Sequence, residues 1–188
     1  MTKAQRTRER LERAAMDLFE QRGYDAVTVG EIAAAAGVTE MTFFRNFAGK
    51  EAVLLDDPYD PAIAEAVGAQ PRHLPPIVRV SAGIAAAWRG LPEPDSEYTR
   101  RRIRIAAGSP ALRAGMWRNN AHTERVIVDR LIADGVDPLA ASVAASACLA
   151  GLLAALLDWA GFEGDAGAGG TLGARIERAL AIVAGSPS

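Results

Sequence analysis

The stretch of sequence that decides the fold is TVGEIAAAAGVTEMTFFRNF, residues 28–47. Thr28 is followed three positions later by Glu31, the spacing of a capping box at a helix start. Gly37 ends this helix in a turn, and Thr39 can cap a second short helix that runs to about Phe44 or Arg45. Two short helices joined by a tight glycine turn form a helix-turn-helix. The second helix of such a motif can enter the major groove of DNA.

On both sides of this motif, the sequence predicts only helices, and therefore an all-α fold. Apolar residues recur at helical spacing, and no segment alternates apolar with polar residues for long. About nine helices are expected, with an N-terminal DNA-binding domain over residues 1–48 and a second helical domain over residues 49–188. Outside the motif, helices are predicted over about residues 5–22, 50–55 with a resumption at 62–67, 77–88, 96–107, 110–133, 138–161 and 172–183.

Composition excludes several classes of protein. The chain has 188 residues, a formal net charge of -2, one cysteine and two histidines. One cysteine allows no intrachain disulfide and no thiolate cluster, and the histidines lack the spacing of metal ligands, so we expect no metal and no cofactor. The first residues are basic but no apolar segment follows them, so we expect no secretory signal and a cytoplasmic protein.

The N-terminal arm is basic although the whole chain is slightly acidic. Residues 1–13 contain five basic and two acidic residues, a local excess of three positive charges. A solvated helix face is the ordinary interpretation of such a run. Next to a helix-turn-helix, we expect the arm to lie along DNA phosphates.

The motif and its surroundings resemble the TetR family of bacterial transcriptional repressors. The resemblance runs from about Arg13 to Leu55 and rests on Phe19, Gly23-Tyr24, Thr28-Val29, Ile32-Ala33, Ala36-Gly37-Val38-Thr39, Thr42-Phe43-Phe44-Arg45-Asn46-Phe47 and Lys50-Glu51. It implies a two-domain homodimer of nine helices per chain. It also implies that a small molecule in the C-terminal domain loosens the grip on a palindromic operator.

Residues for DNA contact follow from the motif and the resemblance. The resemblance implies that Thr28 and Thr39 approach phosphates, and that Lys50 binds a phosphate. Two positions depart from the family pattern: residue 41 is most often glycine, and residue 44 is commonly a tyrosine whose hydroxyl reaches a phosphate. Met41 is a candidate for contact with a thymine methyl group. The predicted DNA-binding residues are Thr28, Thr39, Glu40, Met41, Thr42, Phe43, Arg45, Asn46 and Lys50.

The C-terminal part should hold the effector. Its predicted contacts are Ile84, Trp88, Ile103, Trp117 and Asn120, although residues of this kind at helical spacing are more often core. The cluster Arg100, Arg101, Arg102 and Arg104 can face solvent or bind an anionic ligand. The segment around Asp57-Pro58-Tyr59-Asp60 is similar to actinobacterial regulators that sense fatty acyl-coenzyme A, so acyl-coenzyme A or another hydrophobic ligand is the candidate effector.

The helices near the C-terminus are the predicted dimer interface. Residues 138–161 are rich in alanine and leucine, and residues 138–157 carry no charge over about the length of a membrane span. Small residues give a weak membrane signal, so we expect no membrane insertion. Together with residues 171–184 this segment should pair with a second copy, and the alternative is a buried helix of a monomer.

Two rival functions remain open from the sequence. An all-α enzyme working in the C-terminal pocket would need a nucleophile and base, paired carboxylates or a phosphate loop, and the sequence offers none at suitable spacing. A helical adaptor that binds protein would show no salt-dependent affinity for DNA.

Overall fold

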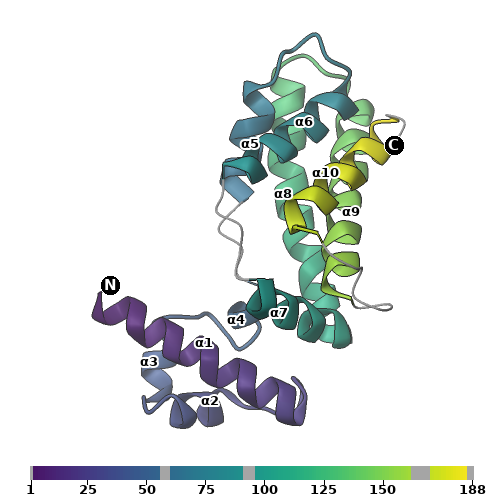
Figure 1. Cartoon of the computed structure of the whole chain (residues 1–188). Coiled ribbons are helices and arrows are strands. Elements are labelled where there is room, and N and C mark those ends of the chain that lie inside the picture. The colour runs from purple at the N-terminus through teal and green to yellow at the C-terminus, as the bar shows by residue number, and fades with distance from the viewer. Residues whose placement is uncertain (1, 56–59, 91–95, 162–169, 186–188) are drawn as a thin grey trace. The chain divides into compact units, whose positions relative to one another are not determined.

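The structure is a computed structural model that describes residues 2–55, 60–90, 96–161 and 170–185. In these ranges every regular element is a helix, and the all-α prediction is confirmed (Figure 1). Ten helices appear where about nine were expected, because the predicted resumption of the fourth helix is a separate helix, α5. The elements are α1 (Lys3–Arg22), α2 (Val29–Ala35), α3 (Glu40–Phe44), α4 (Ala52–Leu55), α5 (Asp60–Ala69), α6 (Pro76–Arg89), α7 (Ser96–Gly108), α8 (Pro110–Ala133), α9 (Pro138–Ala160) and α10 (Leu172–Val183).

The chain divides into two compact units. The first unit contains Met1–Asp56 and Arg101–Met116, and the second contains Asp57–Arg100 and Trp117–Ser188. The predicted boundary between residues 48 and 49 therefore lies before the end of the first unit's N-terminal segment. It also leaves out the part of α7 and α8 that packs with the DNA-binding helices.

The core of the first unit is built on one face of α1. Leu11, Ala15 and Phe19 recur at the three-to-four residue spacing of a helix face, and all three are buried. The apolar side chains of α2 and α3, represented by Ile32 and Phe43, are buried with them. Burying one such Leu, Ile or Phe side chain contributes about 1.5–3 kcal/mol. The two short helices are therefore stabilised by α1 and not by their own length.

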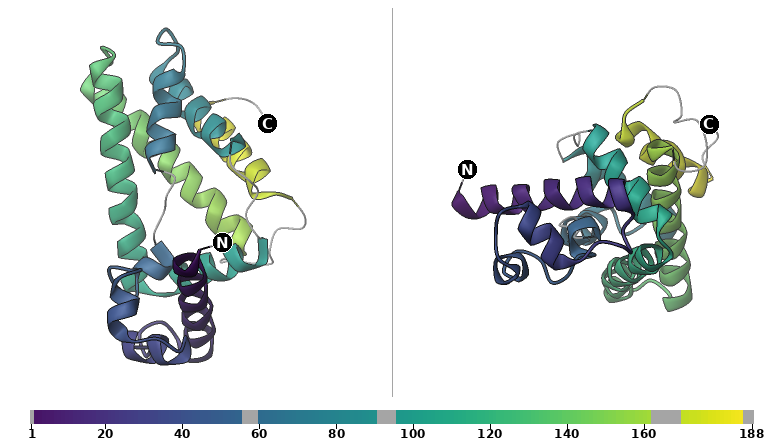
Figure 2. Two further views of the ribbon diagram at one scale, coloured as in Figure 1. Left: turned by 90° about the vertical axis from the view of Figure 1, so that its left-hand side faces the viewer. Right: turned by 90° about the horizontal axis from the view of Figure 1, so that it is seen from below.

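The second unit is organised around α6. This helix packs against α5, α9 and α10, and α9 and α10 also pack against each other (Figures 1 and 2). A close crossing with α5 depends on Gly83, where an added Cβ atom would lie 2.5 Å from the Cα atom of Val67. The absence of a side chain at residue 83 thus sets the distance between α5 and α6.

A buried arginine joins three segments of the second unit. Arg79, in the first turn of α6, is 1% exposed, and its Nε donates to the Val67 carbonyl over 3.3 Å. Its guanidinium also pairs with Asp134, which follows α8. Arg72 and Arg130 pair with the same carboxylate, at 2.8 and 3.2 Å. The hydrogen bond from Arg79, then those from Arg130, hold the pKa of Asp134 below its usual value.

Replacing Asp134 with Asn should lower the thermal midpoint of unfolding by several degrees at neutral pH, because it leaves a buried guanidinium without its counter-charge. The folded-state pKa is lowered, so the stabilisation by Asp134 is present above its unfolded pKa of about 4 and is lost as the pH falls through the folded value. Wild type and Asp134→Asn should therefore differ less in thermal midpoint at low pH than at pH 7. Melting curves across this range would contradict the assignment if the gap stayed constant or widened on acidification.

The apolar helix α9 keeps an uncovered side. It is long and apolar enough to cross a membrane, with a mean hydropathy of 2.1, and a third of its most apolar stretch is buried within the single chain. Its exposed positions include Leu139, Val143 and Ala150, at 73% exposure for Leu139 and 57% for Val143. This exposed stripe of α9 follows the spacing of one helix face.

Candidate nucleic-acid interface

The start of α2 is fixed by the capping box expected from the sequence. The Thr28 hydroxyl accepts from the Glu31 backbone N–H over 3.3 Å, and the Glu31 carboxylate accepts from the Thr28 N–H over 2.8 Å. Arg22 of α1 adds an ion pair with Glu31 at 2.7 Å. The hydrogen bond from the Thr28 backbone, followed by that from Arg22, lowers the pKa of Glu31 to about 2. The predicted Thr28 cap is confirmed, and α1 and α2 are joined at this end.

Helix α3 is capped at both ends by side chains of residues that flank it. The Thr39 hydroxyl accepts from the Thr42 N–H over 3.3 Å, and the two threonine hydroxyls lie 3.0 Å apart. At the other end the Asn46 side-chain amide donates to the Thr42 carbonyl over 2.7 Å. Thr39, Thr42 and Asn46 were predicted as DNA contacts, and in the structure all three have a second role in ending a five-residue helix.

Two arginines of α1 hold the motif at its turn and at its end. Arg10 donates to the Ala36 carbonyl just before Gly37, which has the left-handed φ of +65° that the predicted turn needs. Arg8 donates to the Asn46 carbonyl over 2.8 Å, and its guanidinium carbon lies 4.1 Å from the Phe47 ring centroid. Both arginines belong to the basic arm that was expected to face phosphates. Their guanidinium groups instead satisfy carbonyl groups that α2 and α3 leave unpaired.

Lys50 anchors the loop between α1 and α2. Its Nζ donates to the carbonyls of Tyr24 and Val27, each over 2.9 Å, and lies 4.2 Å from the centroid of the Tyr24 ring. Burial is the main cause that raises the pKa of Tyr24 to about 12. The predicted role of Lys50, phosphate binding, remains a prediction, and the structure adds a clear structural role.

The outer face of α3 carries the surface that DNA would meet. Met41 is 74% exposed and Phe44 is 55% exposed, and Glu40 and Arg45 are also exposed. Phe43 is the exception among the predicted contacts. Its side chain is 0% exposed and packs 5.5 Å, centroid to centroid, from Phe47. The prediction of a DNA contact is therefore wrong for Phe43, which is a core residue.

Glu40 leans towards α2. An added Cβ atom on Gly30 would lie 2.6 Å from the Glu40 carboxylate, so the two helices approach closely at this point. A carboxylate beside the first turn of a helix is favoured by the positive end of the helix dipole.

Helix α7 is attached to the first unit through consecutive arginines. Arg101 forms a two-pronged ion pair with Glu20 of α1 and lies 3.6 Å from Asp17. The hydrogen bond from Arg101 lowers the pKa of Glu20. Arg102 donates to the Leu54 carbonyl of α4 over 2.7 Å. For these two arginines the structure decides the question left open by the sequence, because both bind groups of the protein.

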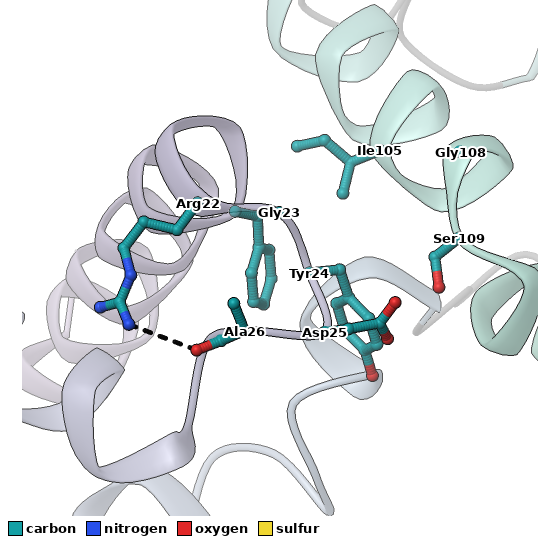
Figure 3. A pocket seen from close by; sticks show the side chains of 9 residues that line it. Arg22, Gly23, Tyr24, Asp25, Ala26, Ile105, Gly108 and Ser109 are labelled. Atoms are coloured by element: carbon teal, nitrogen blue, oxygen red, sulfur yellow. Dashed lines mark hydrogen bonds between the residues drawn. The ribbon is translucent and has the colours of Figure 1, made fainter.

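A hollow of about 450 Å³ lies beside this attachment, between the loop after α1 and the end of α7 (Figure 3). Gly23 and Gly108 line it, and an added Cβ atom on either would meet nothing within 4 Å. Sequence reasoning missed this feature, because residues from two distant segments line it: Phe19, Arg22, Gly23, Tyr24, Asp25, Ala26, Ile105, Gly108 and Ser109.

The predicted effector contacts are divided between the two units. Ile84 is in the core of the second unit, at 2% exposure, while Trp88 and Asn120 are half-buried there. Ile103 belongs to the first unit. The side chain of Trp117 and the segment Asp57-Pro58-Tyr59 lie outside the described residues, and so does the side chain of Asp60.

Comparison with known proteins places this arrangement in a family. The sequence profile of the bacterial regulatory proteins of the tetR family matches residues 12–56, and a profile described as the MftR C-terminal domain matches residues 74–185. The second match covers more than half of the chain. The chain belongs to the TetR family. Its DNA-binding region is therefore the helix-turn-helix of a TetR-family transcriptional regulator.

Relatives agree with the family assignment. The HTH-type transcriptional regulator TcmR of Streptomyces glaucescens is 33% identical over 146 residues, which are 72% of this chain and 63% of that protein. The chain thus spans under two thirds of the length of this relative.

Among solved structures, the TetR-family repressor FadR of Thermus thermophilus is 22% identical, with a TM-score of 0.51 over 94% of this chain and 93% of the other. NalD of Pseudomonas aeruginosa, a repressor of a multidrug efflux pump, is 20% identical, with a TM-score of 0.60 over 97% and 95%. These structures share the fold.

Lys50→Ala should lower the free energy of unfolding by about 1.5–3 kcal/mol, because two carbonyls of the α1–α2 loop lose a charged donor. Urea unfolding followed by circular dichroism measures this change. Arg45→Ala is the matched control: its exposed side chain should affect stability by less than about 0.5 kcal/mol. Equal stability of Lys50→Ala and wild type would contradict the anchoring role and leave phosphate contact as the function of this lysine.

Proposed function

We propose that this TetR-family regulator is a homodimeric repressor that binds a palindromic operator through α3 and is released from it by a small apolar effector. The observation that carries the proposal is the construction of α3. Its ends are fixed by Thr39 and Asn46, and its exposed face presents Met41, Phe44 and Arg45. A short helix held rigidly with exposed side chains near its N-terminus suits docking in a major groove.

Each exposed residue of α3 has a proposed partner on DNA. Met41 would contact a thymine methyl group, and Arg45 would reach a phosphate or a guanine edge. Thr42 would contact the backbone next to the bases. The Glu40 carboxylate lies beside Gly30 of α2, so we propose no base contact for it. Exposed basic residues of α1, such as Arg6 and Arg13, would supply further phosphate contacts.

Dimerisation would place two copies of α3 on one face of the operator. Recognition helices must lie about 34–36 Å apart to reach successive major grooves. The exposed stripe of α9, with Leu139, Val143 and Ala150, supports an interface there, and α10 adds Ile182 at 59% exposure. A second copy would cover these apolar groups, which agrees with a protein that acts on DNA in the cytoplasm and not with a membrane span.

The last part of the proposal is that an apolar effector binds in the second unit. FadR of Thermus thermophilus was solved in complex with lauroyl-CoA, and SmeT was solved with triclosan. We propose a ligand of similar apolar character here, with acyl-coenzyme A as one candidate. Ile84, Trp88, Trp117 and Asn120, which belong to the second unit, remain proposed contacts, whereas Ile103 belongs to the first unit and is not proposed for this site. The ligand would act by binding more tightly to a conformation that does not fit the operator.

The test is a mobility-shift titration of the full chain on DNA from around its own gene. Retarded bands whose log affinity falls steeply with log salt are expected. An absence of binding at low salt over this region would overturn the proposed repressor, and the adaptor or the enzyme would then be the better hypothesis.

Phe44→Tyr should strengthen operator binding by about twofold to tenfold, because it restores the hydroxyl that the family pattern commonly offers to a phosphate. An increase in affinity cannot come from partial unfolding, so this variant tests the docking geometry directly. Fluorescence anisotropy with labelled operator measures it. Unchanged or weaker binding would argue that α3 lies differently on the DNA.

Val143→Asp should convert the dimer to a monomer and weaken operator binding at least tenfold, because it buries an unpaired carboxylate in the proposed interface. Light scattering coupled to size-exclusion chromatography gives the mass. Ala121→Asp, at an exposed position of α8, is the matched control and should remain dimeric. A Val143→Asp variant that stays dimeric would move the interface away from this part of α9.

A further inference from the structure

We infer that Trp159 and Arg100 form the anchor for an acidic effector, an apolar molecule that ends in a carboxylate. This inference rests on the proposed control by an effector and names the chemistry of that effector. Trp159 lies in the last turn of α9, and Arg100 lies in α7, in the part of that helix that belongs to the second unit.

The first observation is an indole N–H without an acceptor. Trp159 is 3% exposed, and its Nε1 is buried with no hydrogen-bond partner among the residues that the structure describes. A buried donor of this kind is unfavourable, and indole groups in protein interiors normally find an acceptor. A ligand oxygen at this position would supply the missing acceptor.

The second observation is a cation on the same ring. The guanidinium carbon of Arg100 lies 4.6 Å from the centroid of the Trp159 ring. A guanidinium and an indole N–H side by side match a carboxylate, since one oxygen can accept from each group and the charges oppose.

The surroundings of Trp159 favour an apolar body on this ligand. The last turns of α9 carry Ala155, Leu156, Leu157 and Ala160, all buried or half-buried. Ligand pockets typically combine such apolar walls with a few polar groups that fix orientation. A medium-chain fatty acid meets both requirements.

Binding would change the contact that Arg100 makes. To accept from both groups, the carboxylate draws the guanidinium from the ring face towards the ring edge, where Nε1 lies. Arg101 and Arg102, the next two residues, hold α1 and α4 in the first unit. A shift of Arg100 therefore acts on the same helix that is attached to the DNA-binding helices.

The experiment is calorimetric titration of the full-length protein with octanoate and decanoate, and with their methyl esters as neutral controls. We expect the acids to bind with dissociation constants below about 1 mM and the esters to bind at least tenfold more weakly. Trp159→Phe keeps an aromatic ring under Arg100 but removes the N–H together with the five-membered ring of the indole; it should weaken binding of the acids about tenfold and binding of the methyl esters much less. Arg100→Gln should do the same.

Arg89→Gln is the matched control, because Arg89 lies on the surface of the same unit in an exposed ion pair with Glu177. It should bind the acids as wild type does. The anchor is overturned if neither acid binds at about 1 mM, or if Trp159→Phe binds as tightly as wild type. Operator affinity is measured separately: acids that bind through Trp159 and leave operator affinity unchanged would sustain the anchor and contradict the proposed effector release.

Discussion

The helix-turn-helix depends on side chains that supply hydrogen-bond partners to its backbone. Helices α2 and α3 have seven and five residues, and a helix leaves its first four N–H and last four C=O groups unpaired within itself. Isolated helices of this length do not form in water. Thr28, Glu31 and Thr39 satisfy the N–H groups, while Arg8, Arg10 and Asn46 satisfy carbonyls at the other ends. The motif is rigid because these partners come from fixed neighbours.

These hydrogen bonds reduce the number of basic groups that can contact DNA phosphates. Arg8, Arg10, Arg22 and Lys50 all donate to backbone carbonyls within the first unit. Fewer positive groups are then left for DNA than the sequence suggests, and the salt dependence of binding scales with the number of phosphates neutralised. One copy of the motif would bind DNA weakly for this reason. A dimer doubles the number of contacts, so the proposed interface on α9 matters for affinity as well as for spacing.

The sequence predicted helices well where their ends are determined locally. Thr28, Gly37 and Thr39 define their caps and turn from residues within a few positions, and Pro110 and Pro138 mark helix starts that the structure confirms. Phe43 could have been placed correctly as well, because it is four residues before Phe47 and shares its face. Its place near the start of α3 is typical of a DNA contact, but its side chain is buried against Phe47.

Contacts between segments that are distant along the chain could not be predicted from the sequence. Lys50 meets the loop after α1 across more than twenty residues, and Arg101 meets Glu20 across a still longer separation. No local pattern distinguishes an arginine that pairs within the protein from one that faces solvent. The position of α7 is the clearest example, because residues from Arg101 onward belong to the first compact unit, far in sequence from the motif.

The division of α7 between the two units bears on the proposed control by a ligand. Arg100 contacts α9 in the second unit, while Arg101 and Arg102 contact α1 and α4 in the first. Arg100, Arg101 and Arg102 are consecutive residues of α7, so a ligand that displaced the α7 backbone at Arg100 would also act on the contacts of the next two residues. Coupling between effector and operator sites typically amounts to about 1–3 kcal/mol. A cation–π contact contributes about 0.5–2 kcal/mol. Replacing the contact between Arg100 and the Trp159 ring by a stronger contact with a ligand carboxylate would therefore change the free energy by an amount similar to this coupling. A switch of this kind needs no large rearrangement of the core, because only the ligand's preference between two positions of one side chain has to be transmitted.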